Sequence, residues 1–454
     1  MEDKDINQRG ETENDKISRR AAFKYIGAGI AGAAAIYAGI HHREKIGQLF
    51  SGNTRLSSEN ARMATREDKL YHHQISLLAF GCMRLPKIDR DKPDIDEVQA
   101  MDLIDYAYQH GVNYFDTAWP YHQGQSETFV GKALKRYPRK SFYLADKMPT
   151  WLIESLEQAK EIFETQLKKC QVDYFDFYHL HSLGSVETYN HVYEELGVYN
   201  YLKEEKEKGR IKHLGFSFHG HRDDFPYFAD KHPWDFVMIQ ANYLDWEVDG
   251  EYLYHELEKR DIQAMIMEPV RGGMLATLNP EAVKILHDAA PDRSTASWAI
   301  QYIASKPNVL TVLSGMSNME QVKDNVKTMS NFHLMTDKEQ QVLDKALSAF
   351  LKVNPLPCTE CAYCMPCPAK VNIPAVFHVF NQCVQEGIVP SVTGSKDTEN
   401  QRKRKAFLAK LNRAVPGKNQ PSHCTGCEIC KTHCPQNIDI PAKMKELAAI
   451  LKGR

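Results

Sequence analysis

Short apolar runs alternate with amphipathic stretches through the middle of the chain, from about residue 71 to residue 350. The apolar runs that predict strands cover residues 76–80, 113–116, 142–147, 175–181, 213–217, 236–242, 263–268 and 309–313. The stretches that predict helices, where apolar residues recur at helical spacing, cover residues 98–110, 126–136, 156–170, 199–208, 251–260 and 295–305. Eight strands with their helices in about 280 residues are typical of an α/β fold closed as a (β/α)8 TIM barrel. An open, doubly wound sheet is the alternative.

The N-terminus follows a different pattern, in which a polar segment precedes a short apolar run. Ser18, Arg19 and Arg20, followed by Phe23 and Lys24, stand before an apolar run at residues 25–40. This arrangement resembles a twin-arginine (Tat) export signal, and the run is shorter than the roughly 20 residues of a membrane-spanning helix. We therefore expect residues 1–40 to be a signal or, if uncleaved, a membrane anchor, with an ordinary buried helix as the alternative.

This interpretation predicts export to the periplasm or the outer face of the inner membrane, and a cytoplasmic protein if the signal does not function. The same run contains a GxGxxG pattern at residues 27–32. Because a polar segment precedes it where a dinucleotide-binding loop needs a strand, we do not expect that loop here. Residues 41–70 are polar and are interpreted as a linker to the barrel.

Composition narrows the class of protein. The chain has 454 residues, of which 43% are hydrophobic and 26% charged, with a formal net charge of -2. These values are typical of globular protein and argue against a disordered or multi-spanning chain. A net charge so close to zero gives no indication that the chain as a whole binds nucleic acid.

Polar residues stand at or just after the ends of three predicted strands, where the reactive groups of such barrels gather. They are Asp116, Tyr121, Lys147 and His181. An ammonium group beside a phenol favours phenolate, so Lys147 is expected to lower the pKa of Tyr121 and make it a usable acid. Asp116 would hold Lys147 charged, and His181 would donate a hydrogen bond to a carbonyl oxygen. The set predicts reduction of a carbonyl group.

From about residue 75 to residue 325 the sequence resembles the aldo-keto reductase family. Its Asp, Tyr, Lys and His tetrad falls on Asp116 and Tyr121 in GVNYFDTAWPY, Lys147 in LADKMP and His181 in FDFYHLHS. The resemblance implies a (β/α)8 barrel at residues 71–350 that interconverts a small carbonyl compound (aldehyde, ketone or sugar-like) and an alcohol. His179 is expected to point to the opposite face of its strand.

The resemblance also implies a nicotinamide cofactor, NAD or NADP, across the barrel mouth. The positions that match the family's cofactor contacts are Ser217, Gln240, Met267, Arg271, Ser317 and Asn325. Gln240 would bind the carboxamide, while Ser217 is followed by Phe218 where the family has Asn. The loop around Ser317 lacks the Arg or Lys that an NADP-selective site needs for the 2′-phosphate, which favours NAD or loose selectivity.

Nine of the 11 cysteines lie in residues 351–454, which predicts a separate C-terminal domain. Cys424, Cys427, Cys430 and Cys434 reproduce the bacterial ferredoxin spacing of a 4Fe-4S site, and Cys358, Cys361, Cys364 and Cys367 form a second run. By ferredoxin logic the fourth Cys of each run serves the other cluster. Because the last gap of the second run is one residue short, Cys383 is the alternative to Cys367. Zinc is the alternative to two 4Fe-4S clusters, and three successive two-residue gaps with Cys-Pro endings favour iron.

Taken together, the sequence predicts an iron-sulfur-containing member of this family, with a mainly helical, ferredoxin-like C-terminal domain. Its activity would be carbonyl–alcohol oxidoreduction with nicotinamide, coupled or adjacent to 4Fe-4S electron transfer, and a redox partner protein is possible. The alternative is a non-catalytic electron-transfer or redox-sensing protein whose barrel only binds a nucleotide.

Overall fold

The structure is a computed structural model that describes residues 62–89, 92–352, 355–391 and 398–452. The predicted export signal at residues 1–40, and residues 41–61 of the predicted linker, lie outside the described residues. Within the described part, no helix has both the length and the apolar character to span a bilayer. Residues 62–454 form one compact unit.

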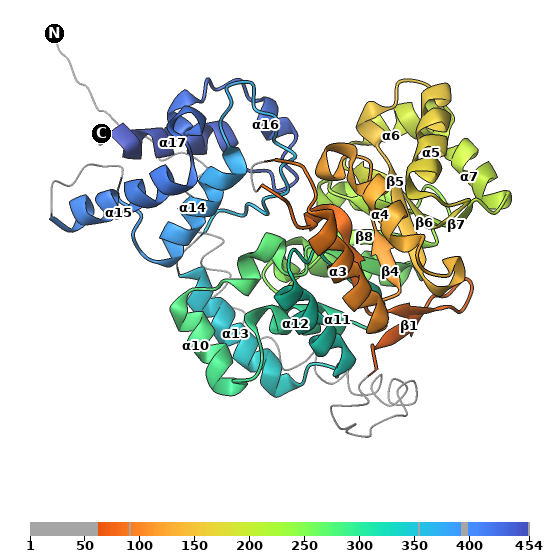
Figure 1. The fold of residues 1–454 in the computed structure, drawn as a ribbon, viewed down its shortest axis with the longest axis horizontal. Helices are drawn as coiled ribbons and strands as arrows, with labels where there is room; N and C mark the ends of the chain where they lie inside the picture. Colours follow the sequence, from red (N-terminus) through yellow and green to blue (C-terminus); the bar gives the residue numbers. More distant parts are fainter. Residues whose placement is uncertain (1–61, 90–91, 353–354, 392–397, 453–454) are drawn as a thin grey trace, which may run out of the picture. The chain divides into compact units, whose positions relative to one another are not determined.

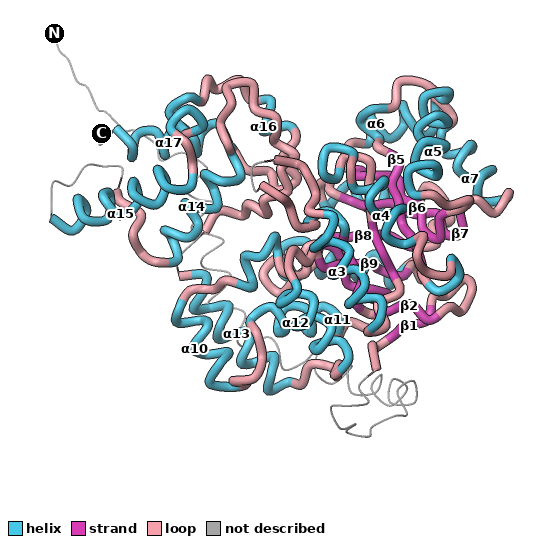
Figure 2. Tube along the Cα trace, in the orientation of Figure 1, coloured by secondary structure: helices cyan, strands magenta, loops and turns pink. Residues whose placement is uncertain are grey.

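Eight parallel strands close into a barrel in the order β10-β3-β4-β5-β6-β7-β8-β9. Figures 1 and 2 show strands of this barrel gathered together, with helices around them. The strands are β3 (Leu78–Gly81), β4 (Tyr114–Asp116), β5 (Tyr143–Met148), β6 (Phe175–Leu183), β7 (Ile211–Phe218), β8 (Phe236–Gln240), β9 (Gln263–Met267) and β10 (Val309–Ser314). Each overlaps one of the eight strands that the apolar runs predict, because parallel strands covered on both faces are almost wholly apolar. The closed barrel is confirmed and the open doubly wound sheet is wrong.

Helices surround the barrel and follow the amphipathic stretches of the sequence (Figure 1). They are α3 (Glu97–Gln109), α4 (Ser126–Leu134), α5 (Leu156–Cys170), α6 (Val186–Tyr189), α7 (Val198–Glu207), α8 (Phe225–Ala229), α9 (Glu251–Lys259), α10 (Pro280–Ala289), α11 (Thr295–Ala304), α12 (Met319–Ser330) and α13 (Asp337–Leu351). Side chains cap several of their N-termini, as Asp96 does for α3 and Ser155 for α5.

The barrel has two layers of core. The larger layer lies between strands and helices, and a smaller one fills the barrel interior with side chains that include Tyr114, Phe177, Phe236 and Met265. These large apolar groups make the interior a packed core rather than a channel. The polar groups of the site are therefore held at the strand ends.

A short hairpin precedes the barrel and was not predicted by the apolar pattern. β1 (Thr65–Glu67) pairs antiparallel with β2 (Gln74–Ser76). In the turn between them Asp68 is buried and lies 3.1 Å from His213 Nε2. Hydrogen bonds from His213 and the turn backbone outweigh burial and lower the pKa of Asp68 to about 2. The hairpin is thus tied to β7 by a buried carboxylate.

Residues 355–452 form a helical region with a hydrophobic core of its own. Its helices are α14 (Ile373–Gln385), α15 (Thr398–Ala414), α16 (Ile429–Thr432) and α17 (Ile440–Lys452), drawn in blue in Figure 1. Apolar side chains of α14 and α17, among them Phe377 and Leu447, fill this core, while α15 contributes only Phe407 and Leu411. The cysteine-bearing loops lie before α14 and around α16.

Candidate active site

The four predicted catalytic residues meet at the carboxyl ends of neighbouring strands. Asp116 ends β4, Tyr121 begins the 3-10 turn that follows it, Lys147 lies in β5 and His181 in β6. Since β4, β5 and β6 are adjacent and parallel, their carboxyl ends share one rim of the barrel. The closed parallel topology therefore brings together residues spread over 65 positions of the sequence.

Asp116 and Lys147 form a buried ion pair. Lys147 Nζ lies 2.5 Å from Asp116 Oδ1 and donates a second hydrogen bond to the Thr117 carbonyl at 2.6 Å. The two side chains are 2% and 1% exposed. Burial raises the pKa of Asp116, and the ammonium group of Lys147 opposes that rise. These contacts hold the ammonium group of Lys147 in a fixed position beneath the mouth of the barrel.

The expected lowering of the Tyr121 pKa is wrong. Lys147 Nζ lies over the Tyr121 ring, 4.9 Å from its centroid. Removal of the phenol from water, reinforced by the negative charge of Asp116, raises the pKa of Tyr121 well above its usual value. Burial and the charge of Asp116 therefore outweigh the ammonium group of Lys147 in setting the pKa of the phenol. Tyr121 is a neutral O–H donor in this arrangement.

His181 completes the set as a neutral imidazole. Burial lowers its pKa well below the usual value, and the charge of Lys147 lowers it further. Its ring lies edge-on to Tyr121 at 6.2 Å and 5.0 Å from the ring of Trp151, which is 48% exposed. A neutral imidazole beside a neutral phenol offers two hydrogen-bond donors for one substrate oxygen.

His179 does not point away from the site as expected. Its Nε2 lies 3.9 Å from Asp116 Oδ2, and the side chain is fully buried. Residues two apart in a strand share a face, which places His179 and His181 on the same side of β6. His179 therefore lies beneath the tetrad.

The residues predicted to bind nicotinamide lie at or near the same rim, and the polar ones already have protein partners. Ser217 Oγ accepts a hydrogen bond from the Ser182 amide at 2.8 Å, and Met267 ends β9. Arg271 Nη2 lies 2.9 Å from Asp245 Oδ1. Arg271 therefore already has an acidic partner within the protein.

Gln240, the residue expected to bind a carboxamide, faces a second primary amide. Gln436 Nε2 donates to Gln240 Oε1 at 2.8 Å, and Gln240 Nε2 lies 3.3 Å from Gln436 Oε1 and 3.0 Å from Asp245 Oδ2. Sequence reasoning missed Gln436 and Asp245. No local pattern links residue 436 to residue 240.

The structure also places Ser317 and Asn325 in the loop and helix that follow β10. Ser317 Oγ donates to the Arg84 carbonyl at 2.8 Å, and Asn325 Nδ2 donates to Ser314 Oγ at 2.8 Å. Asn325 is buried in α12, whereas Ser317 is part-buried. Both side chains are held by neighbouring parts of the barrel.

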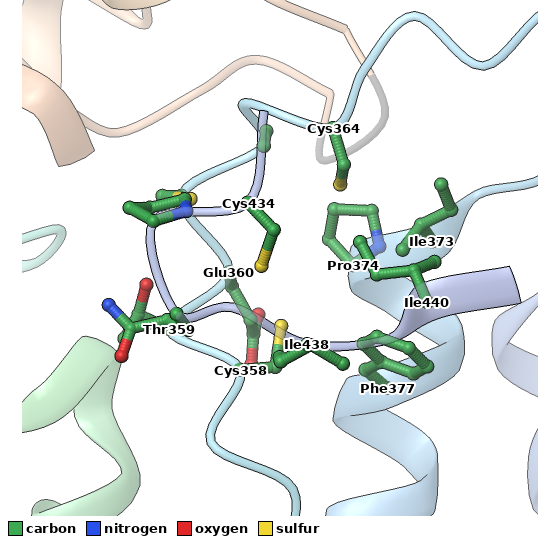
Figure 3. A pocket seen from close by; sticks show the side chains of 14 residues that line it. Cys358, Thr359, Glu360, Cys364, Ile373, Pro374, Phe377, Cys434, Ile438 and Ile440 are labelled. Carbon is green, nitrogen blue, oxygen red and sulfur yellow. The ribbon is translucent and has the colours of Figure 1, made fainter. Parts of the chain in front are cut away.

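A cavity in the C-terminal region is lined by cysteines from both runs of the sequence. Cys358, Cys361, Cys364 and Cys434 line it together with apolar side chains such as Phe377. Figure 3 shows the sulfur atoms of Cys358, Cys364 and Cys434 turned toward this space. Burial, together with the neighbouring Cys361 and Cys434, raises the pKa of Cys358 to about 12. Three thiols that are close together in the sequence and one that is far from them in the sequence thus line the same cavity.

The remaining cysteines of the two runs form a second group. Burial raises the pKa of Cys430, and nearby Cys424, Cys367 and Cys427 raise it further. Cys383 lies elsewhere, in the hydrophobic core, where burial raises its pKa to about 11. Among the described residues, no group of three or more His, Cys, Asp or Glu is arranged to hold a single metal ion.

The comparisons with known proteins agree with this geometry. The model of the Aldo/keto reductase family matches residues 77–348. The uncharacterized oxidoreductase YqkF of Bacillus subtilis is 27% identical over 300 residues, which cover 59% of this chain and 92% of that protein. The NADH-specific methylglyoxal reductase of Escherichia coli is 24% identical, over 52% of this chain and 84% of that protein.

Among solved structures, the holo form of an aldo-keto reductase from Bacillus halodurans is similar with a TM-score of 0.52 and 28% identity. The match covers 63% of this chain and 96% of that one. The family match ends before the first cysteine run, so it describes the barrel and not the C-terminal region.

Proposed function

Since the chain belongs to the aldo/keto reductase family and is an oxidoreductase of that type, we propose that its barrel interconverts a small carbonyl compound and an alcohol with nicotinamide. The observation that carries the proposal is the meeting of Asp116, Tyr121, Lys147 and His181 at one rim. These residues hold one ion pair and two neutral donors where a substrate oxygen would lie.

The roles of the four residues in the reaction follow from which of them are charged and which are neutral. His181 and Tyr121 donate hydrogen bonds to the carbonyl oxygen, and Tyr121 passes its proton to that oxygen as negative charge develops. The resulting phenolate is stabilised by the ammonium group of Lys147, which Asp116 keeps in place. In the oxidative direction the steps reverse, and the Tyr121 phenolate beside Lys147 takes the proton of the alcohol. The raised pKa of Tyr121 keeps the proton on the residue until the substrate is bound.

A bound nicotinamide would supply or take the hydride. Gln240 would hold its carboxamide, since this side chain already pairs with the primary amide of Gln436, a group of the same chemistry. Ser217, Met267 and Arg271 would flank the ring, and Ser317 and Asn325 would lie toward the nucleotide end. The absence of Arg and Lys from residues 315–321 supports NAD over NADP, and the relative from Escherichia coli is named as NADH-specific.

The C-terminal region would hold two 4Fe-4S clusters. The first set of ligands is Cys358, Cys361, Cys364 and Cys434, and the second is Cys367, Cys424, Cys427 and Cys430. Thiols spread around a cavity suit a cluster, in which each of four irons takes one thiolate, better than a single ion. When bound, the clusters would carry single electrons, which a redox partner protein would exchange. The position of Cys383 in the hydrophobic core supports Cys367 as the fourth ligand.

The proposal includes export. The twin-arginine motif at residues 18–24 suits a chain that acquires its cofactors and folds before it crosses a membrane. A fusion of residues 1–45 to a reporter protein would test this directly. We expect export of the reporter to require Arg19 and Arg20.

The central test is Tyr121→Phe in the full chain. We expect turnover of carbonyl substrates to fall by about a thousandfold or more, because the proton donor is lost, while NADH binding is retained. Tyr108→Phe is the matched control, since it removes the same atom from a phenol that pairs with Ser141 on the outside of the barrel. Undiminished turnover in Tyr121→Phe would refute the assignment.

A further inference from the structure

Two side chains of the C-terminal region reach the residues proposed to bind cofactor and substrate. Gln436 pairs with Gln240 through both ends of the two amides. The Tyr363 hydroxyl lies 3.4 Å from His181 Nε2. Both come from the cysteine-bearing loops, Tyr363 from between Cys361 and Cys364 and Gln436 from two residues after Cys434. The loops that line the first cysteine cavity therefore also cover the barrel mouth.

The chemistry of the two contacts matches that of the proposed ligands. The Gln436 side chain ends in a primary carboxamide, which is the group that nicotinamide would present to Gln240. A phenolic hydroxyl at His181 Nε2 stands where the alcohol or carbonyl oxygen of a substrate would accept its hydrogen bond. The two protein groups thus occupy both ends of the reaction site at once.

A third contact, made by Thr359, holds the loop at residues 359–363 against the barrel, and the local sequence of the barrel leaves room for it. The Thr359 carbonyl accepts a hydrogen bond from Arg84, and Thr359 is buried. A Cβ at Gly272 would meet Thr359 O at 2.3 Å, and Gly272 has a φ of +64°. Only glycine fits that approach and that backbone conformation. Arg84 is in turn held 3.9 Å from Glu268.

We propose that the loop 359–363 and Gln436 form a built-in inhibitor of the barrel's active site. This proposal rests on the proposed function, because it takes nicotinamide and a carbonyl compound as the ligands displaced. In the covered state groups of the protein itself occupy the hydrogen-bonding positions of Gln240 and of His181 Nε2, so NADH and substrate bind only when the cover lifts. Binding and covering are then competing states of one equilibrium, and weakening the cover tightens apparent binding.

The competition has a direct thermodynamic test that does not depend on turnover. NADH binding to the full chain is measured by its fluorescence under anaerobic conditions for the parent protein, Gln436→Leu and Tyr363→Ala. Leucine keeps the size of the side chain but loses both amide hydrogen bonds, and alanine removes the phenol from the mouth. We expect each change to lower the Kd for NADH by about tenfold, since each removes contacts that only the covered state makes.

Gln382→Ala is the matched control, because Gln382 is an exposed residue of α14 in the same region. Its Kd should equal that of the parent. Hydrogen exchange of the parent gives a second readout that needs no variant. Amides of residues 358–364 should exchange faster when NADH is added, because the ligand holds the cover open.

Three outcomes decide the matter. Tighter binding in both variants with an unchanged control supports the cover. Equal binding in all four proteins, with no change in exchange, overturns the cover while leaving Tyr121-dependent turnover intact. If none of the proteins binds NADH, yet carbonyl reduction from an artificial electron donor still requires Tyr121, then the cover and the nicotinamide assignment both fail and the carbonyl chemistry stands.

Discussion

The barrel and the cysteine-rich region (residues 355–452) differ in what surrounds the reactive groups of their sites. At the barrel mouth, the charge of Lys147 is met by Asp116 and by a carbonyl oxygen of the chain. In the cysteine-rich region, the thiols of Cys358, Cys364 and Cys434 face a shared cavity rather than acceptors of the protein (Figure 3). The ammonium group of Lys147 thus has partners within the protein, whereas these thiols are gathered around an open space.

This difference extends to the hydrophobic cores. The barrel core runs continuously between eight strands and the surrounding helices, whereas the core of residues 355–452 is a separate, much smaller cluster. A small hydrophobic core contributes little free energy beyond what offsets the conformational entropy that the chain loses on folding. In such regions metal ligation commonly contributes the remaining stability. We therefore expect loss of a charge to act on the stability and turnover of the barrel, and loss of a thiolate to act on the cysteine-rich region.

The largest effect should come from breaking the ion pair of the barrel. Lys147→Met leaves Asp116 buried without its partner, which we expect to cost about 3 to 5 kcal/mol of unfolding free energy. Turnover should fall by about a thousandfold or more, because no cation then stabilises the Tyr121 phenolate. Denaturant unfolding followed by tryptophan fluorescence, together with steady-state rates, measures both effects.

A double variant separates the two roles of the pair. Asp116→Asn combined with Lys147→Met removes both charges, so we expect most of the lost stability to return while turnover stays absent. Recovery of turnover in the double variant would show that the charge of Lys147 serves the fold alone.

The next effect concerns the cysteine-rich region. Cys434→Ser should reduce the iron content of the anaerobically purified chain by about half, because it removes the distant thiolate of one set of four. Cys383→Ser is the matched control and should leave the iron content unchanged, since Cys383 packs in the apolar core. Iron loss in the control and not in Cys434→Ser would reverse the assignment of the fourth ligand.

Removing the iron of the proposed clusters should unfold the cysteine-rich region and leave the barrel folded. After treatment with a chelator and an oxidant, we expect amides of α14 and α17 to exchange at least about tenfold faster, while those of β5 and β6 keep their protection. Hydrogen exchange resolved by peptide measures both in one sample. Equal loss of protection in both regions would mean that the barrel depends on the cysteine-rich region for its stability.

The fold was largely predictable from the sequence, because strands buried on both faces are continuous apolar runs. All eight barrel strands were found this way. The hairpin of β1 and β2 was missed, since residues 65–67 read Thr-Arg-Glu and carry no apolar signal. The hairpin is held by contacts with distant parts of the chain, among them Asp68 with His213, 145 residues away, and Arg66 with the carbonyl of Lys306.

That the four residues of the tetrad lie at one rim could be predicted from the sequence, whereas their electrostatics could not. The order of motifs placed Tyr121 beside Lys147. The direction of the Tyr121 pKa depends on how deeply the phenol is buried and on the charge of Asp116, and neither follows from spacing. The contacts of Gln436 and Tyr363 with the barrel join residues more than 180 positions apart and have no local signature.

The smallest predicted effect is a pH dependence of the unfolding free energy that arises from a buried histidine of the barrel. His219 follows β7 close to the tetrad, and burial together with the charge of Lys147 lowers its pKa to about 4. In the unfolded chain its pKa is about 6.5, so between these values the unfolded state binds the proton more strongly. Unfolding free energy therefore falls as the pH drops from 7 to 4.5.

For His219→Gln, which cannot titrate, we expect this fall to be smaller by about 2 kcal/mol, allowing for partial contact of the ring with water. The difference between the parent and the variant at each pH cancels any acid sensitivity of the cysteine-rich region, because both proteins carry it. Unfolding curves at pH 7 and 4.5 give the four values needed. Parallel losses in the two proteins would place the proton uptake on other groups, of which the buried His179 and His181 are the next to replace.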